Sequence, residues 1–337
     1  TFSPPISTYL FFLAFLFLAE IFFIKSYARF KPLQSEFKGS YVDYFFQASQ
    51  NLGYQPIASN QVNALKVTEL GDTLYHVYYT IDEYARRKTL LPPNANPQQF
   101  ATFFGGSIVF GEGLNEELTL ASLFSEKNQD YASHNYGFCG YGPNQMLALM
   151  ETDRLPNEVG PLQKGVCVYV FIDDHILRAI GSMDRVLEYA QSHPYYDFEG
   201  DKLVRKGSFE SAGFVERYEK IKWLKNLHMD YPIRLQDKHY KLTAKIIEES
   251  HRLFKEQFPE SSFYMLGYPG EDNKILSYIE DPQINLLDYS QFFTRNQHRI
   301  KVGADHHPNA EANRLVIDRL TQDIQKNIKQ EVSINQK

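Results

Sequence analysis

The sequence is poor in cysteine and tryptophan. Its 337 residues include two cysteines, Cys139 and Cys167, and one tryptophan, Trp223. Two cysteines do not supply a Cys-rich zinc site. We interpret both as small core residues rather than as a disulfide pair or a nucleophile, and they do not fix the redox compartment.

Clustered positive charge is also lacking. The formal net charge is -6, and no long run of Lys and Arg is interleaved with aromatic residues. Nucleic-acid-binding domains carry such basic patches, so the sequence predicts no nucleic-acid partner. The length allows one large domain with additions, or two domains, with a sizeable core.

One serine lies where a tight turn would expose it. Residues Ala101–Phe104 have the apolar character of a buried strand end, and Glu116–Phe124 has helical spacing. Between them, Gly105 and Gly106 permit a close turn. We therefore expect Ser107 on a strand-to-helix connection, with its own backbone N–H facing a developing oxyanion. Taken alone, the segment also fits an ordinary Gly-Gly-Ser loop.

A base and a carboxylate for this serine occur near the C-terminus. A free hydroxyl is a poor nucleophile at neutral pH. His307 can take the proton of Ser107, and Asp305 can hold the other ring nitrogen of His307. The alternative for this segment is a polar turn in which Asn309 caps the last helix. With both segments present, the sequence favours a triad of Ser107, His307 and Asp305.

With the serine turn first and the Asp-His segment last, the sequence resembles the SGNH/GDSL hydrolase family over residues 102–320. That family opens with Gly-Asp-Ser and closes with Asp-x-His, and here the segments read Gly-Gly-Ser at 105–107 and Asp-His-His at 305–307. Residues 135–145 resemble its second block, which implies that the N–H of Gly140 is a second oxyanion donor. The resemblance implies a three-layer α/β/α sandwich with a mainly parallel, flavodoxin-like sheet. Strands that alternate with helices along the sequence indicate the same class.

The third family block departs from its pattern. The family has Gly-x-Asn-Asp after a strand, whereas here the strand Val166–Phe171 leads to Asp173 at the position of the Asn. An ionised carboxylate repels an oxyanion. Asp173 must therefore be protonated, be turned away, or be replaced by another donor, and Asn144 and His175 are candidates for that role or for substrate binding. Loss of one oxyanion donor typically lowers the rate by about a hundred- to a thousandfold, so without a replacement donor the enzyme would be slow or would have lost catalysis.

Carboxylates and imidazoles at 173–175 and 306–307 also suit a metal site. No short His-x-x-x-His spacing or cysteine cluster supports that interpretation. We expect neither a metal nor an organic cofactor. Asp174 and His175 then form a polar strand end that bonds neighbouring loops.

Residues 1–29 are predicted to be a transmembrane anchor. The segment Ile6–Ile24 is mostly apolar, with Glu20 as its only charge, and at about 1.5 Å per residue it just crosses a bilayer. No small-residue cleavage site follows, which favours a retained anchor over a removed signal peptide. A buried core helix is the alternative.

The side of the membrane on which the domain lies is a separate question. Basic residues after the segment favour a cytoplasmic domain. The family resemblance implies a periplasmic or extracellular domain, and this is the location we expect.

Residues 30–98 are predicted to form an accessory region. Tyr41–Gly53 has helical spacing, and Asn63–Thr80 alternates as strands do. Leu91–Pro97 breaks the pattern as a linker. The strands would either extend the catalytic sheet or form a small lobe.

Residues 99–330 are predicted to form the catalytic domain. Besides the elements already named, we expect helices at 144–153, 236–258 and 312–328, and strands at 261–267 and 285–288. Residues 194–232 interrupt this alternation as an insertion that would cap the active site or pack elsewhere. Residues 331–337 are expected to be a frayed tail.

The functional prediction is a membrane-anchored serine hydrolase that cleaves an O-acyl ester, such as an O-acetyl ester, of a cell-envelope molecule. The ester would belong to a glycan, a lipid or another small molecule. One alternative is transfer of the acyl group to a glycan hydroxyl, beside an integral-membrane partner protein. A second is a catalytically silent scaffold subunit of a membrane complex.

Overall fold

The computed structural model describes residues 35–294 and 307–335. The predicted anchor, Ile6–Ile24, and the residues Asp305 and His306 lie outside this part of the chain. Among the helices within the described ranges, none has both the length and the apolar character needed to cross a membrane.

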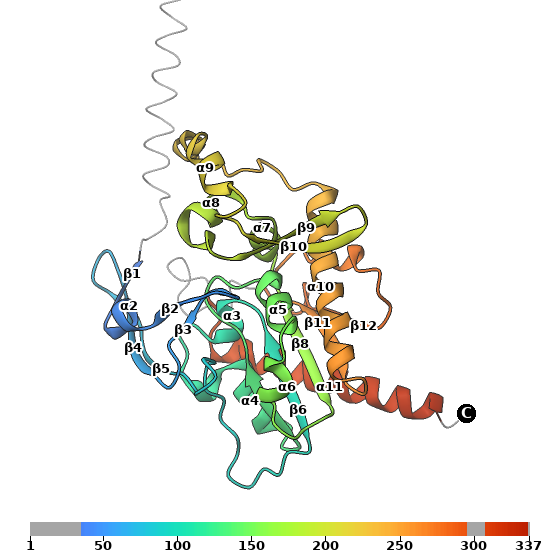
Figure 1. Cartoon of the computed structure of the whole chain (residues 1–337). Coiled ribbons are helices and arrows are strands. Elements are labelled where there is room, and N and C mark those ends of the chain that lie inside the picture. Colours follow the sequence, from blue (N-terminus) through green and yellow to red (C-terminus); the bar gives the residue numbers. More distant parts are fainter. Residues whose placement is uncertain (1–34, 295–306, 336–337) are drawn as a thin grey trace, which may run out of the picture.

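A five-stranded parallel sheet forms the centre of the molecule (Figure 1). Its strand order is β12-β11-β8-β6-β7, and all four strand pairs are parallel. The strands are β6 (Gln99–Phe104), β7 (Tyr131–Asn135), β8 (Gly165–Phe171), β11 (Ser262–Gly267) and β12 (Ile284–Asp288). All seven residues of β8 are buried, as expected for an apolar central strand covered on both faces.

Helices cover both faces of this sheet. On one face lie α4 (Leu120–Lys127) and α11 (Ala310–Asn335), and on the other lie α5 (Pro143–Met150), α7 (Asp174–Ile180) and α10 (Asp237–Gln257). The apolar stripe of α10 packs Leu242, Ile246 and Phe254 into the core, as its periodicity predicts. The predicted α/β class with a parallel sheet is confirmed.

The chain reverses its direction of travel across the sheet between β6 and β8. From β6 it steps outward to the edge strand β7, and it then returns to β8 on the other side of β6. In open parallel sheets, ligands bind outside the carboxyl ends of the strands at such a reversal. Here those ends lead into the turn at 105–107 and into the segment 172–175.

The accessory strands form separate small sheets. The first contains β1 (Ser35–Lys38), β4 (Gln61–Thr68) and β5 (Thr73–Thr80), and the second contains β2 (Phe46–Ser49) and β3 (Gly53–Pro56). All of their pairings are antiparallel. The accessory region is thus a lobe beside the main sheet rather than an extension of it.

The predicted helix at Tyr41–Gly53 is wrong beyond its first turn. Only α2 (Ser40–Tyr44) is helical, and the chain then turns into the β2–β3 hairpin. The aromatic residues that suggested one helical face pack in several directions. The ring of Phe45 contacts Tyr79 and Phe110, and the exposed Phe46 contacts the ring of Phe138 at a tilt of 49°. Tertiary packing has overridden the local periodicity.

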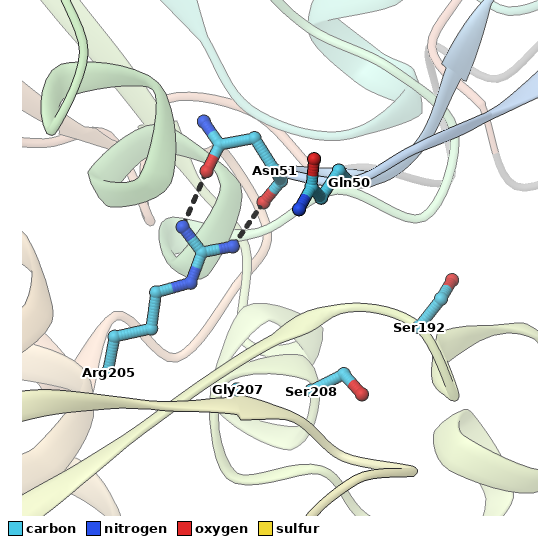
Figure 2. A pocket seen from close by; sticks show the side chains of 6 residues that line it. All are labelled: Gln50, Asn51, Ser192, Arg205, Gly207 and Ser208. Atoms are coloured by element: carbon cyan, nitrogen blue, oxygen red, sulfur yellow. Dashed lines mark hydrogen bonds between the residues drawn. The ribbon is translucent and has the colours of Figure 1, made fainter.

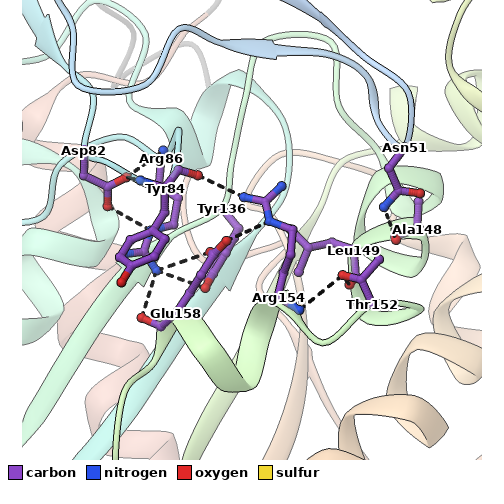
Figure 3. A network of polar contacts seen from close by, with 10 residues as sticks. All are labelled: Asn51, Asp82, Tyr84, Arg86, Tyr136, Ala148, Leu149, Thr152, Arg154 and Glu158. Carbon is purple, nitrogen blue, oxygen red and sulfur yellow. Dashed lines mark hydrogen bonds and ion pairs between the residues drawn. The ribbon is translucent and has the colours of Figure 1, made fainter.

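A buried polar network ties this lobe to the central domain (Figure 3). The guanidinium of Arg86 pairs with Asp82 at 2.8 Å, donates to the hydroxyl of Tyr136 at 3.0 Å and lies 3.6 Å from the carboxylate of Glu158. Arg154 donates to the carbonyl oxygen of Tyr84 at 2.9 Å. These contacts join the segment after β5 to the end of β7 and to the helix α6 (Arg154–Glu158).

The predicted insertion at 194–232 carries the hairpin β9 (Pro194–Glu199) and β10 (Lys202–Ser208), the helix α9 (Phe214–Glu219) and the 3-10 helix η3 (Lys222–Leu227). With α8 (Met183–Arg185) it builds a small apolar cluster of its own.

The last helix is longer than expected. α11 begins at Ala310 and continues to Asn335, so its backbone is helical through most of the predicted frayed tail. The other short elements are α3 (Ser107–Phe110), the π-helix η2 (Val186–Ala190) and the 3-10 helices η1 (Glu116–Leu118) and η4 (Lys274–Tyr278).

Candidate active site

Ser107 lies at the reversal point of the sheet. β6 ends at Phe104, two glycines follow, and Ser107 is the first residue of the short helix α3. A Cβ atom on Gly106 would lie 2.6 Å from Nη1 of Arg178 and 3.2 Å from Nε2 of His175. This crowding gives a physical reason for glycine at position 106, where the family that the sequence resembles has aspartate.

The structure brings His307 to this serine from the far end of the chain. Nε2 of His307 lies 2.8 Å from Oγ of Ser107, a hydrogen-bond distance suited to proton transfer. Asn309 accepts a hydrogen bond from the N–H of Ala312 at 3.0 Å, and it thereby caps the start of α11. The capping and the serine contact occur together, so the two interpretations of this segment are compatible.

A carboxylate that the sequence analysis missed also reaches His307. Oε2 of Glu112 lies 3.4 Å from Nε2 of His307, on the same ring nitrogen that faces Ser107. Oε1 of Glu112 accepts hydrogen bonds from Lys66 and from the hydroxyl of Tyr75, each at 3.1 Å. Two strands of the accessory lobe, β4 and β5, therefore hold a charged group of the site.

Glu112 is nearly inaccessible, with 7% of its surface exposed. Burial of a carboxylate is costly unless it is paired and hydrogen-bonded, and Lys66 satisfies that requirement. Burial, and next the charge of Glu112, raise the pKa of the Cys139 thiol well above its usual range. The thiol donates to Oε2 of Glu112 at 3.3 Å. Cys139 is thus a neutral donor at the edge of the site rather than a thiolate nucleophile.

Gly140 follows Cys139 in the predicted second block. Its φ of +81° suits glycine, and a Cβ there would collide with the hydroxyl of Tyr54 and the ring of Tyr189. The Tyr54 hydroxyl donates to the carbonyl oxygen of Cys139 at 2.7 Å. Among the described residues, the N–H of Gly140 donates to no backbone carbonyl. The hairpin β2–β3 therefore fixes the turn that contains this N–H.

The carboxylate of Asp173 bonds the loop after β11. Its Oδ2 accepts a hydrogen bond from the N–H of Asp272 at 2.8 Å, and its own N–H donates to Glu271 at 3.0 Å. Of the three options that the sequence left open, this contact fits the second, a carboxylate turned to a neighbouring loop.

The side chain of Asn144 bonds backbone carbonyl groups inside the protein. The Asn144 amide donates to the carbonyl oxygens of Ala179 at 3.2 Å and Pro194 at 2.8 Å, and the side chain is buried. This geometry does not fit the expected oxyanion or substrate contact at Asn144, because the donor is already used.

His175 is buried behind the glycine turn. Its Nδ1 lies 2.8 Å from the hydroxyl of Tyr169, and its Nε2 is shielded from solvent and has no hydrogen-bond partner among the described residues. Burial, and next the charge of Arg178, hold the pKa of His175 well below its usual range. A neutral, covered ring supports the turn at Gly106, and the substrate contact expected of His175 stays a prediction.

Asp174 belongs to an ion-paired cluster. Its carboxylate pairs with Arg178 at 2.6 Å and with Arg185 at 2.8 Å, and Arg178 donates to the carbonyl oxygen of Tyr141 at 2.6 Å. The predicted role of Asp174 as a polar strand end that bonds neighbouring loops agrees with these contacts.

A polar pocket of about 560 Å³ lies between the accessory hairpin and the insertion (Figure 2). Arg205 spans it by donating to both the side chain and the backbone oxygen of Asn51. The pocket is lined by Gln50, Asn51, Ser192, Arg205, Gly207 and Ser208. Tyr54 and His193 lie close in the chain to Asn51 and Ser192, and their rings are 5.0 Å apart. Because the Tyr54 hydroxyl contacts the turn at Gly140, this ring contact connects the pocket wall to that turn.

No protein-family model and no curated protein matches the chain. Several solved structures align with it at low identity. An acetyl xylan esterase from Butyrivibrio proteoclasticus shares 10% identity over 69% of this chain and 65% of that chain, with a TM-score of 0.38. A member of the lipolytic G-D-S-L family from Veillonella parvula shares 12% over 66% and 97%, with a TM-score of 0.39. A family two carbohydrate esterase from Clostridium thermocellum, solved with cellohexaose, shares 12% over 72% and 68%, with a TM-score of 0.39.

Proposed function

We propose that this chain is a serine esterase of the SGNH type. The observation that supports the proposal most directly is the 2.8 Å contact between Oγ of Ser107 and Nε2 of His307. A serine on a glycine turn at the reversal point of a parallel sheet, in contact with an imidazole, is the arrangement that nucleophilic acyl transfer requires.

The reaction would proceed through an acyl-enzyme. Oγ of Ser107 attacks the acyl carbonyl carbon while its proton passes to Nε2 of His307. The N–H groups of Ser107 and Gly140 stabilise the oxyanion. His307 then gives the proton to the leaving alcohol as the ester bond breaks. Water repeats the sequence on the acyl-serine and releases the carboxylic acid.

Two carboxylates would support the imidazolium that forms in each step. Asp305 is assigned to the other ring nitrogen of His307, as the sequence predicts. Glu112 adds a negative charge 3.4 Å from Nε2. Because it contacts His307 and not the reacting carbonyl, we assign Glu112 as a positioning residue.

For the substrate we propose an O-acyl ester of a glycan or another hydroxyl-rich cell-envelope molecule. The pocket at Asn51 and Arg205 offers amide, hydroxyl and guanidinium groups to such a molecule. Anchoring through residues 1–29, with the domain on the periplasmic or extracellular side, is part of the same proposal. Acyl transfer to a sugar hydroxyl would use the same residues and would differ in requiring the acceptor for turnover.

The test is covalent labelling of the full chain, solubilised in detergent, with a fluorophosphonate, followed by intact-mass measurement. We expect one adduct per chain, lost in Ser107→Ala and in His307→Ala. The matched control is Ser277→Ala, because Ser277 is exposed and does not line the polar pocket. An adduct that persists in Ser107→Ala would contradict the assignment of Ser107 as the nucleophile. The absence of any adduct on folded protein would contradict the proposal and favour a silent scaffold.

A further inference from the structure

A second surface, on the insertion, combines exposed apolar side chains with positive charge. Trp223 and Leu227 on η3 are 57% and 58% exposed, and Ile233 in the following loop is 65% exposed. Large apolar side chains exposed this fully within one short segment are a feature of interaction surfaces. We define the basic apolar surface as this exposed face of residues 217–241.

The charge of this segment opposes that of the whole chain. Residues 217–241 contain seven Lys and Arg and three Asp and Glu, a formal charge of +4, whereas the chain carries -6. Five of these basic side chains form no ion pair with any described residue: Lys220, and the four that line one pocket, Arg217, Arg234, Lys238 and Lys241. The surface therefore attracts anions although the molecule as a whole repels them.

The basic and apolar side chains meet around one hollow of about 660 Å³. Aromatic and aliphatic side chains, among them Phe198, Phe214 and Leu242, share its lining with four of the unpaired basic residues. The hollow is thus apolar in part and carries several positive charges.

η3 lies beside this hollow. Ile221 and Leu224, next to and within η3, pack against the apolar cluster that contains Phe214 and Tyr218, and both of these aromatic residues line the hollow. The rings of Tyr218 and Tyr231, which both line the hollow, are 6.2 Å apart. Trp223 and Leu227 therefore extend the same surface. In Figure 1 the segment 217–241 runs from the helix labelled α9 to the start of α10.

We propose that the basic apolar surface binds a membrane that contains anionic phospholipid. Phosphate headgroups would meet the Lys and Arg side chains, while Trp223, Leu227 and Ile233 would enter the interface between headgroups and acyl chains. Leu227 and Ile233 favour lipid over an acidic glycan, because a glycan has no apolar layer into which exposed aliphatic side chains could be buried. This inference depends neither on the esterase proposal nor on the predicted anchor.

The single tryptophan makes the test specific to this surface. The full chain is reconstituted into vesicles of phosphatidylcholine, with and without phosphatidylglycerol, and Trp223 fluorescence is recorded with and without brominated lipid. We expect a blue shift and quenching by brominated lipid in the anionic vesicles. Because the predicted anchor contains no tryptophan, its insertion into the bilayer adds no signal.

Two variants and two controls accompany this measurement. Leu227→Asp should abolish most of the quenching, because it places a charge where an apolar side chain would enter the interface. The double variant Lys238→Glu/Lys241→Glu should do the same, since each basic residue lost weakens membrane binding by about fivefold. Leu286→Asp and Lys164→Glu make the same chemical changes at exposed positions outside the surface and should leave quenching unchanged.

Three outcomes would overturn the proposal. The first is no quenching in any vesicle. The second is equal quenching in both lipid compositions, unaffected by the charge reversals. The third is a blue shift produced by soluble polygalacturonate without lipid, which would assign the surface to an acidic glycan.

Discussion

At the scale of single residues, the candidate site depends on one carboxylate that no family motif indicates. Glu112 follows Ser107 by five positions, and its N–H donates to the carbonyl oxygen of Ser107 at 3.0 Å. The side chain then turns to His307 and is held there by Lys66. A negative charge at this distance stabilises the imidazolium that forms during acyl transfer.

Glu112→Gln tests this assignment. The substitution keeps the shape of the side chain and removes its charge, so we expect kcat for a small aryl ester to fall by about tenfold, or about 1.4 kcal/mol in the barrier, with KM little changed. Steady-state kinetics over a pH series provides the measurement. Glu117→Gln, at an exposed position of the nearby helix η1, makes the same chemical change away from His307 and is the control. An unchanged kcat in Glu112→Gln would remove the residue from the mechanism.

At the scale of elements, the accessory lobe builds part of the site wall. The β2–β3 hairpin places the Tyr54 hydroxyl on the carbonyl oxygen of Cys139, and the hydroxyl of Tyr141 donates back to the carbonyl oxygen of Tyr54 at 2.5 Å. The N–H of Gly140, the second proposed oxyanion donor, lies between these two contacts in the sequence. The hairpin therefore restricts the turn on which transition-state stabilisation would depend.

Tyr54→Phe removes this restraint without removing the ring. One hydrogen bond contributes about 1 kcal/mol, so we expect kcat to fall by about fivefold and the rate of fluorophosphonate labelling to fall in parallel. Tyr78→Phe alters an exposed tyrosine of the same lobe and should affect neither rate. Equal rates in Tyr54→Phe and the unaltered chain would show that the hairpin does not fix the oxyanion turn.

At the scale of the whole molecule, histidines shielded from solvent link stability to pH, and His134 and His193 join His175 in having a lowered pKa. Burial, and next the charge of Arg86, lower the pKa of His134 to about 3. Burial, and next the charge of Arg178, lower the pKa of His193 to about 3. Between pH 6.5 and pH 3 the unfolded chain binds protons at these positions and the folded chain does not, so the free energy of unfolding rises with pH across this window.

We therefore expect each histidine to reduce the free energy of unfolding by about 2 kcal/mol between pH 7 and pH 5. Urea denaturation at the two pH values measures the loss. In His193→Phe, which retains an aromatic ring against Tyr54, the loss should shrink by about the contribution of one histidine. A loss of the same size in the variant would show that His193 does not titrate as its burial implies.

Much of the fold was accessible from the sequence because it is encoded locally. The continuous apolar run at Val166–Phe171 predicted a central strand, and β8 is that strand. The stripe in 236–258 predicted the amphipathic helix α10. The helix expected at Tyr41–Gly53 failed because its aromatic residues pack on partners from several distant elements, which periodicity does not record.

For the candidate site, the sequence by itself determined the glycine turn that presents Ser107 and the presence of His307 near a capped helix start. Both follow from short-range rules of backbone freedom and capping. Only the tertiary structure decided that Lys66 and Glu112 would pair beside His307, that Asp173 would bond Asp272, and that Asn144 would be used inside the core. The physical reason is that each of these contacts joins different segments of the chain, and their geometry exists only once the sheet and its covering layers have packed.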